Sequence, residues 1–180
     1  MTALSDLQPE DRGLLVGLLY RAGVWMSHAD DEHGEADDRR EMKALAHIIK
    51  SIAKVHESSA FVQDAARETL AHHEQWPSWA EHAFDILADC EKAYATLKFT
   101  VTDDDRKDYC QTLLHIAETV AAAYGEFGQG ADDDEETLAG FLGKVVGRLK
   151  GEEQDSGFMN ISPAEEDALE RLRVALHMDE

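Results

Sequence analysis

Apolar residues recur along the chain at intervals of three and four, the spacing that places them on one face of an α-helix. Seven stretches carry this pattern, and no stretch of useful length shows the apolar–polar alternation of a half-buried strand. The seven apolar stripes run over residues 15–25, 42–52, 61–70, 84–97, 113–120, 138–149 and 169–176. The pattern predicts an all-α protein, a compact bundle of about seven helices.

Residues typical of helix starts precede several of these stripes. The start signals are Pro9 for the first helix, Ser58 or Ser59 for the third, Thr102 with three aspartates for the fifth, and Ser162 for the last. The signal at Ser162 is the most complete, because Pro163 follows it and Glu165 completes a capping box.

The start of the fourth helix is expected after a break at residues 76–77. Ser78 and Glu81 have the spacing of a capping box, so we expect the helix to begin there and to bury Phe84. The two tryptophans of this segment predict a packed corner. An exposed anchor for a partner protein is the alternative, because Trp is enriched at interaction hot spots.

A polar segment that contains glycine divides the chain. Residues 1–150 are expected to form one helical domain, 151–161 a linker, and 162–180 a C-terminal helix that packs on the same domain. A chain of 180 residues is long enough to bury a core without disulfides. Cys90 and Cys110 lie within apolar helical patterns, so we expect both to be reduced core residues.

The charge of the chain limits its partners. Lys and Arg total 17 against 38 Asp and Glu, a net charge of −21. Nucleic acid and anionic membranes are therefore poor partners, whereas cations and basic protein patches are favoured. The chain begins without the basic and apolar segments of a signal peptide and has no apolar run of membrane-spanning length, so we expect a cytoplasmic protein with no membrane insertion.

The two halves of residues 1–150 show an internal repeat. A shift of 95 places Leu18, Leu19 and Ala22 on Leu113, Leu114 and Ala117, and a shift of 96 places Met42, Leu45 and Ile49 on Leu138, Phe141 and Val145. Each half reads as an apolar helix, an acidic loop that contains glycine, and a second apolar helix. The repeat predicts a pseudo-twofold arrangement.

The two acidic loops offer oxygen ligands for a hard cation such as Ca²⁺. The first contains Asp30, Asp31, Glu32, Glu35, Asp37 and Asp38, with Glu41 one turn into the next helix; the second contains Glu126, Asp132, Asp133, Asp134 and Glu135. Neither has EF-hand spacing. Acidic residues at a helix start also cap it and complement its dipole, so capping without metal is the alternative.

An acidic loop followed by Asp-Asp-(Asp)-Glu at the start of an amphipathic helix, found twice in an all-helical chain, resembles the tellurite-resistance TerB-like family. The closest segment is AETVAAAYGEF followed by DDDEETLAGFLGKVV, and the first copy is AGVWMSHADDEHGEADDRREMKAL; together they cover about a third of the chain. The resemblance implies a seven-helix fold with pseudo-twofold repeats, acidic metal-binding loops, a link to stress and tellurite response, and no assigned enzymatic activity.

The same resemblance nominates ligands for a divalent cation. They are Asp30, Asp31 and Glu35 in the first loop, Asp37, Asp38 and Glu41 at the start of the next helix, and Asp132, Asp133, Asp134 and Glu135 in the second copy. The family usually has Asp-Gly directly after the first helix of each copy, but the second copy has Tyr124-Gly125 there. We therefore expect the second site to be the weaker one.

Other site chemistry finds little support in the sequence. A ferritin-like di-iron site needs Glu-x-x-His, and none of the nine histidines follows a glutamate at that spacing. The nearest approximation is Glu68 with His72, four residues apart. His72 and His73 are expected on a solvated helix end beside Glu74, with a transition-metal site at the histidine pair as the alternative. His47, His82 and His115 lie beside apolar stripes and are expected at the edge of the core. No nucleotide-binding or nucleophile motif is present, so we expect no enzyme.

Two hypotheses follow from the sequence. The first is a non-enzymatic metal-binding or stress-response accessory protein, with a divalent cation in the acidic loops. The second is an acidic helical adaptor that docks a basic protein partner, with the loops only capping helices.

Overall fold

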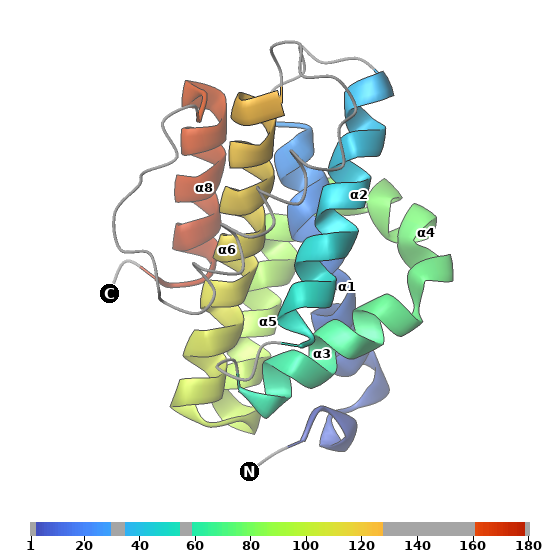
Figure 1. Cartoon of the computed structure of the whole chain (residues 1–180). Coiled ribbons are helices and arrows are strands. Elements are labelled where there is room, and N and C mark those ends of the chain that lie inside the picture. The colour runs from blue at the N-terminus through green and yellow to red at the C-terminus, as the bar shows by residue number, and fades with distance from the viewer. Residues whose placement is uncertain (1–2, 30–34, 55–58, 128–160, 179–180) are drawn as a thin grey trace.

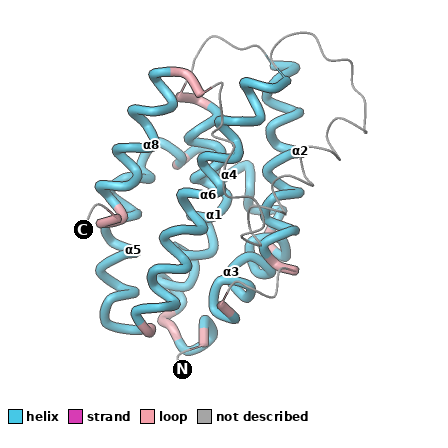
Figure 2. The backbone as a smooth tube through the Cα atoms, turned by 60° about the vertical axis from the view of Figure 1, so that its left-hand side comes forward, coloured by secondary structure: helices cyan, strands magenta, loops and turns pink. Residues whose placement is uncertain are grey.

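The computed structural model describes residues 3–29, 35–54, 59–127 and 161–178, with the backbone alone for 35–42 and 123–127. These residues form seven α-helices and no strand (Figure 2). The helices are α1 (Pro9–Ser27), α2 (Glu35–Ile52), α3 (Ala60–Ala71), α4 (Trp76–Glu81), α5 (Ile86–Thr100), α6 (Asp103–Phe127) and α8 (Pro163–Ala175). Short 3₁₀ turns cover Leu4–Asp6, His73–Gln75 and Ala83–Asp85. The predicted all-α bundle is confirmed.

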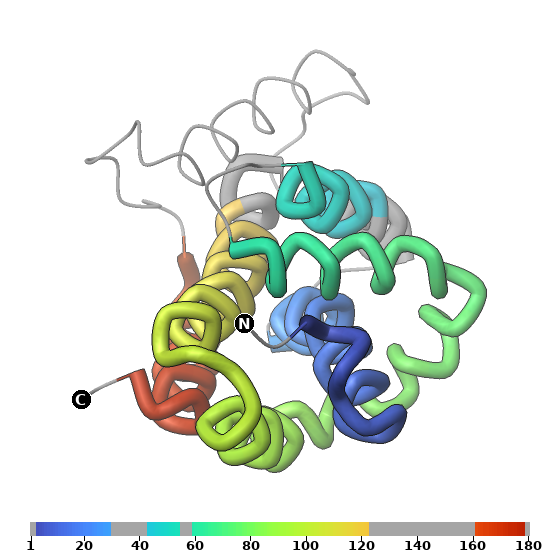
Figure 3. The backbone as a smooth tube through the Cα atoms, turned by 90° about the horizontal axis from the view of Figure 1, so that it is seen from below, coloured from blue at the N-terminus to red at the C-terminus, as the bar shows by residue number. Residues whose placement is uncertain are grey.

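Helix α1 lies in the middle of the bundle. It contacts α2, α3, α4, α5, α6 and α8, and in a view along the bundle the other helices surround it (Figure 3). Every residue from Leu15 to Val24 is buried, including Arg21 and two glycines. A helix that is buried on all sides needs no polar face, and α1 carries almost none over this span. Trp25, expected in the stripe, is only partly buried.

The most extensive contacts of α1 are with α6, which runs beside it (Figure 1). The six residues that the repeat aligns on these two helices are all buried: Leu18, Leu19, Ala22, Leu113, Leu114 and Ala117. The Tyr109 hydroxyl of α6 donates a 2.7 Å hydrogen bond to the Leu15 carbonyl of α1. The two helices that the repeat pairs therefore pack directly against each other.

Three of the predicted helix starts are confirmed by their capping bonds. The Ser59 hydroxyl accepts a hydrogen bond from the Val62 amide at 3.3 Å. The Thr102 hydroxyl accepts one from the Asp105 amide at 3.1 Å and donates to the Asp105 carboxylate at 2.7 Å. The Ser162–Glu165 capping box before α8 is formed, with bonds of 2.7 and 3.3 Å.

The predicted start of the fourth helix at Ser78 is wrong. The short helix α4 already begins at Trp76, with Pro77 in its first turn, where a proline costs no hydrogen bond. A 3₁₀ turn follows α4, and the long helix α5 begins only at Ile86. The turn directs Ala83 into the core and leaves Phe84 71% exposed, so the expected burial of Phe84 is also wrong.

The packed corner predicted from the two tryptophans is confirmed. Both rings pack against the core cluster. Trp76 stacks on Tyr20 of α1 with ring centroids 4.5 Å apart, and its indole N–H donates to the Thr69 carbonyl at 3.0 Å. Trp79 lies over Gly17, where an added β-carbon would be 3.6 Å from the indole ring.

Helix α8 packs on α5 and α6. Arg173 of α8 pairs with Glu118 of α6 at 3.1 Å, and His177 stacks on Tyr94 of α5 with centroids 4.4 Å apart. The helix predicted over 138–149, and the linker over 151–161 except its last residue, lie outside the described residues. No helix in the described part of the chain is long and apolar enough to cross a membrane.

Candidate metal site and acidic surface

The first predicted metal site lies between α1 and α2. Helix α1 ends at Ser27 and α2 begins at Glu35. Asp30 and Asp31, between the two helices, lie outside the described residues. Glu35, Asp37, Asp38 and Glu41 belong to the first two turns of α2, for which the backbone alone is described. Carboxylates in these turns lie at the positive end of the α2 dipole, as the capping alternative also requires.

The two helices that flank this segment are packed closely. A β-carbon added at Gly23 would lie 2.4 Å from the Leu45 side chain, so glycine at this position lets α2 approach α1 one turn before the loop. The last turn of α1 is closed by hydrogen bonds from the Ser27 hydroxyl to the Val24 carbonyl, at 2.7 Å, and from the Ala29 amide to the Met26 carbonyl, at 3.0 Å. The two helices that flank the acidic segment are therefore in direct contact at Gly23 and Leu45.

The second predicted metal site follows α6, which ends at Phe127. Its candidate ligands Asp132, Asp133, Asp134 and Glu135 all lie outside the described residues. Elsewhere, the described residues contain no group of three or more His, Cys, Asp or Glu side chains that could hold a metal ion.

Glu68 and His72 each contact a group other than the side chain of the other residue. The Glu68 carboxylate forms a two-bond ion pair with Arg12 of α1, in which the Nε–Oε2 distance is 2.8 Å. His72 is exposed, and its Nδ1 lies 2.8 Å from the backbone carbonyl of Glu68. The carboxylate is therefore engaged by an arginine, and the histidine lies at a solvated helix end as expected.

The expectation that three histidines lie at the edge of the core holds for one of them. His115 is half-buried on α6. His47 and His82 are exposed, so for them it is wrong. His82 follows the short helix α4, where the chain turns outward, and its Nδ1 is 3.7 Å from the Asp85 carboxylate.

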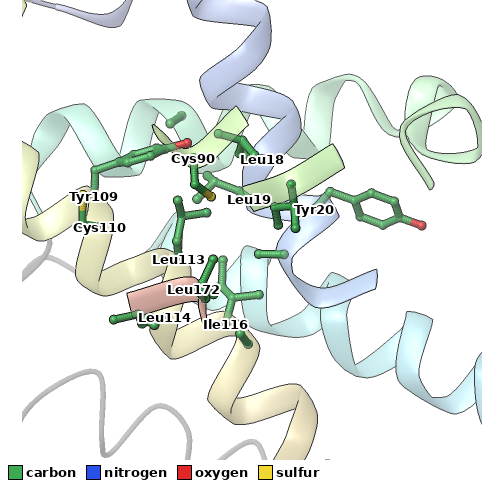
Figure 4. Packing of buried hydrophobic residues seen from close by; sticks show 14 of the residues in the cluster. Leu18, Leu19, Tyr20, Cys90, Tyr109, Cys110, Leu113, Leu114, Ile116 and Leu172 are labelled. Atoms are coloured by element: carbon green, nitrogen blue, oxygen red, sulfur yellow. The ribbon is translucent and has the colours of Figure 1, made fainter. Parts of the chain in front are cut away.

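The two cysteines are free and buried, as predicted. Figure 4 shows Cys90, Cys110 and Tyr109 among the apolar side chains of the core. Burial raises the pKa of Cys90 well above the usual range and that of Cys110 to about 12. Both thiols are therefore protonated at neutral pH and lack the thiolate that a nucleophile requires.

The sequence pattern did not identify Arg21 as a buried arginine. Its guanidinium lies 2.7 Å from the Asp89 carboxylate of α5 and donates to the His82 carbonyl at 2.5 and 3.1 Å. A charged side chain in the middle of an apolar helix was the available signal, because such a residue needs a partner when it is buried.

An exposed aromatic pair was also not predicted. Phe84 of the turn before α5 stacks with His28 at the end of α1, with centroids 5.8 Å apart. Both side chains are exposed. The signal for an exposed Phe84 was the acidic sequence around it. The chain has no Lys or Arg between Arg67 and Lys92 and has six acidic residues there.

Comparison of the chain with protein-family models, with curated proteins and with solved structures gave no match. The resemblance to the TerB-like family rests on the acidic loops and the helix pattern, and stays a prediction.

Proposed function

We propose that the protein is a non-enzymatic, cytoplasmic cation-binding protein of the metal or stress response, similar to the TerB-like family. A divalent cation such as Ca²⁺ binds to the acidic segment between α1 and α2, with carboxylates from residues 30–41 as its ligands. A second, weaker site lies at residues 132–135, after α6.

The observation that carries this proposal is the direct packing of α1 on α6. These are the two helices that the internal repeat aligns, and each is followed by an acidic segment in the sequence. The shared burial of their aligned residues supports the repeat, and the repeat is the reason to interpret the two acidic segments as equivalent sites.

The chemistry of the donor set fits a hard cation. All six candidate ligands in the first segment are carboxylates, and Ca²⁺ takes six to eight oxygen ligands, some of them from backbone and water. The backbone of α2 spaces Asp37 and Glu41 one turn apart, and α1 and α2, which flank the segment, contact each other at Gly23 and Leu45.

Calorimetric titration of chelator-treated protein with Ca²⁺, Mg²⁺ and Zn²⁺ tests the proposal. We expect saturable Ca²⁺ binding together with a rise in the melting temperature, because a ligand at 100 times its dissociation constant adds about 2.7 kcal/mol to the free energy of unfolding. The titration is run at low and at physiological salt, since cations also screen a net charge of −21. Absence of saturable binding at millimolar Ca²⁺ in both salts rejects the proposal.

A matched pair of variants separates a site from general charge. Asp37→Asn with Asp38→Asn removes two charges but keeps capping oxygens, because Asn caps a helix about as well as Asp. Glu166→Gln with Asp167→Asn removes two charges from exposed residues in the first half of α8. We expect the first pair to lower Ca²⁺ affinity and the second to leave it unchanged. Equal effects would support screening or capping without a site.

A further inference from the structure

Phe84 is a large apolar side chain on the surface of the folded chain. It lies in the 3₁₀ turn Ala83–Asp85 between α4 and α5, and 71% of it is exposed. The ring of His28, from the end of α1, stacks against it at 5.8 Å and an interplanar angle of 29°. The contact with His28 restricts the Phe84 ring on one face, which reduces the side-chain freedom lost on binding.

Exposed acidic residues lie on both sides of Phe84 in the sequence. Glu81 precedes Phe84 by three residues, Asp85 follows it directly, and both are exposed. His82 lies 3.7 Å from the Asp85 carboxylate through its Nδ1, and Arg21, which donates to the His82 carbonyl, is buried and paired with Asp89. Residues 68–91 contain no Lys or Arg that could neutralise these carboxylates locally.

We propose that His28, Glu81, Phe84 and Asp85, here called the Phe84 surface, bind a basic amphipathic segment of a partner protein. An apolar side chain of the partner packs on the Phe84 ring, and its Lys or Arg side chains pair with Glu81 and Asp85. Charge complementarity sets the choice of partner and the association rate, and the aromatic contact supplies the anchor.

The charge of the Phe84 surface argues against the other occupants of an exposed aromatic patch. Nucleic acid and anionic membranes carry charge of the same sign and are repelled. A second copy of the chain would place carboxylates against carboxylates, which is disfavoured. This inference does not rest on the proposed cation site, because none of the four residues of the Phe84 surface is a candidate cation ligand.

The chain contains a matched control for the anchor. Phe99, near the end of α5, is 84% exposed, more than Phe84, but follows the exposed Lys98. If exposed apolar area alone drives binding, the two phenylalanines are equivalent. If the acidic surroundings select a basic partner, only Phe84 contributes.

The test uses a fluorescently labelled amphipathic helical peptide of lysine and leucine, with fluorescence anisotropy as the readout. We expect Phe84→Ala to weaken binding about tenfold, the effect of losing a central aromatic anchor, and Phe99→Ala to leave it unchanged. Both residues are exposed, and circular dichroism checks that each variant keeps the helical fold. Unchanged binding on Phe84→Ala, or equal losses for both variants, overturns the proposal.

A second pair of variants tests the charges. Glu81→Gln with Asp85→Asn is expected to weaken binding severalfold and to flatten its dependence on salt, whereas Glu166→Gln with Asp167→Asn makes the same change in charge on α8 with a smaller effect. Amide shifts in a heteronuclear NMR titration are expected to cluster at residues 81–87. Equal losses for the two pairs, or shifts spread over all acidic helices, would indicate attraction to the net charge alone and overturn the assignment.

Discussion

Helices α1 and α8 show two ways in which a helix joins this bundle. α1 is buried along every residue from Leu15 to Val24, including a charged arginine and two glycines. α8 buries one stripe against α5 and α6 and leaves Val174 57% exposed. Start signals in the sequence predict where both helices begin, but the burial of α1 depends on the helices that surround it. Substitutions should therefore have larger effects in α1 than in α8.

The largest expected contrast is between the two arginines. Arg21→Ala removes a buried side chain that holds Asp89 and the His82 carbonyl, so we expect the free energy of unfolding to fall by about 3 kcal/mol. Arg173→Ala in α8 breaks a half-exposed pair with Glu118 and should cost less than about 1 kcal/mol. Urea denaturation measures both. Equal losses would show that the buried arginine of α1 contributes no more to stability than the half-exposed arginine of α8.

The glycines of α1 sharpen the contrast within one helix. At Gly23 an added methyl group would lie 2.4 Å from Leu45. We expect this overpacking to lower the free energy of unfolding of Gly23→Ala by about 1–3 kcal/mol, and the higher helix propensity of Ala offsets part of the loss. At Gly13 nothing lies within 4 Å, and Gly13→Ala should stabilise by about 0.5–1 kcal/mol. Thermal denaturation of the two variants is the measurement. A stabilising Gly23→Ala would mean that α1 and α2 are less closely packed.

The core beside α1 should also make stability depend on alkaline pH. Burial is the main cause that raises the pKa of Cys90, and Arg21 opposes it. Below about pH 8.5 the thiol is protonated in both states; above it the unfolded state ionises and the folded state does not, so the free energy of unfolding falls. At pH 9.5 this loss is about 1.4 kcal/mol for one thiol. Cys90→Ala should reduce the slope between pH 8.5 and 9.5, and an unchanged slope would contradict the assignment.

The smallest expected effect is at the end of α8. His177 has φ of 51°, and the amides of His177 and Met178 bond back to the carbonyls of Val174 and Arg173 at 3.1 and 3.0 Å. A glycine would adopt this backbone more easily, but it would lose the stack on Tyr94. We expect His177→Ala to cost about 1 kcal/mol and His177→Gly to lie near the native value. Equal stability of the two variants would show that the left-handed backbone adds no strain.

Local signals predicted the fold where local chemistry decides it. The capping box at Ser162 and Glu165 depends on residues three apart, so the sequence contains all of it. Around Ser78 the same capping pattern was misleading, because Pro77 is compatible with a first helical turn and Trp76 packs on Tyr20, a contact 56 positions away along the chain. Tertiary packing there outweighs a favourable N-cap.

The candidate sites were predictable in different degrees. Clustered carboxylates are visible in any sequence, so the acidic segments could be named, although their ability to hold a cation depends on geometry that composition does not contain. The Phe84 surface was missed because helical periodicity assigned Phe84 to the stripe of α5, and the 3₁₀ turn shifts it off that stripe. Burial of Arg21 was missed because it requires Asp89 from another helix.

The proposed cation site after α1 and its weaker counterpart after α6 are tested most directly by calorimetric Ca²⁺ titration of two double variants. One is Asp37→Asn with Asp38→Asn, and the other is Asp133→Asn with Asp134→Asn. We expect the first to lose most of the Ca²⁺ affinity and the second to lose little, because the second loop has Tyr124 and Gly125 where the first has acids, and glycine-rich segments cost more entropy to order. A larger loss from the second pair would reverse the ranking, and native Ca²⁺ affinity in both variants would contradict the proposal.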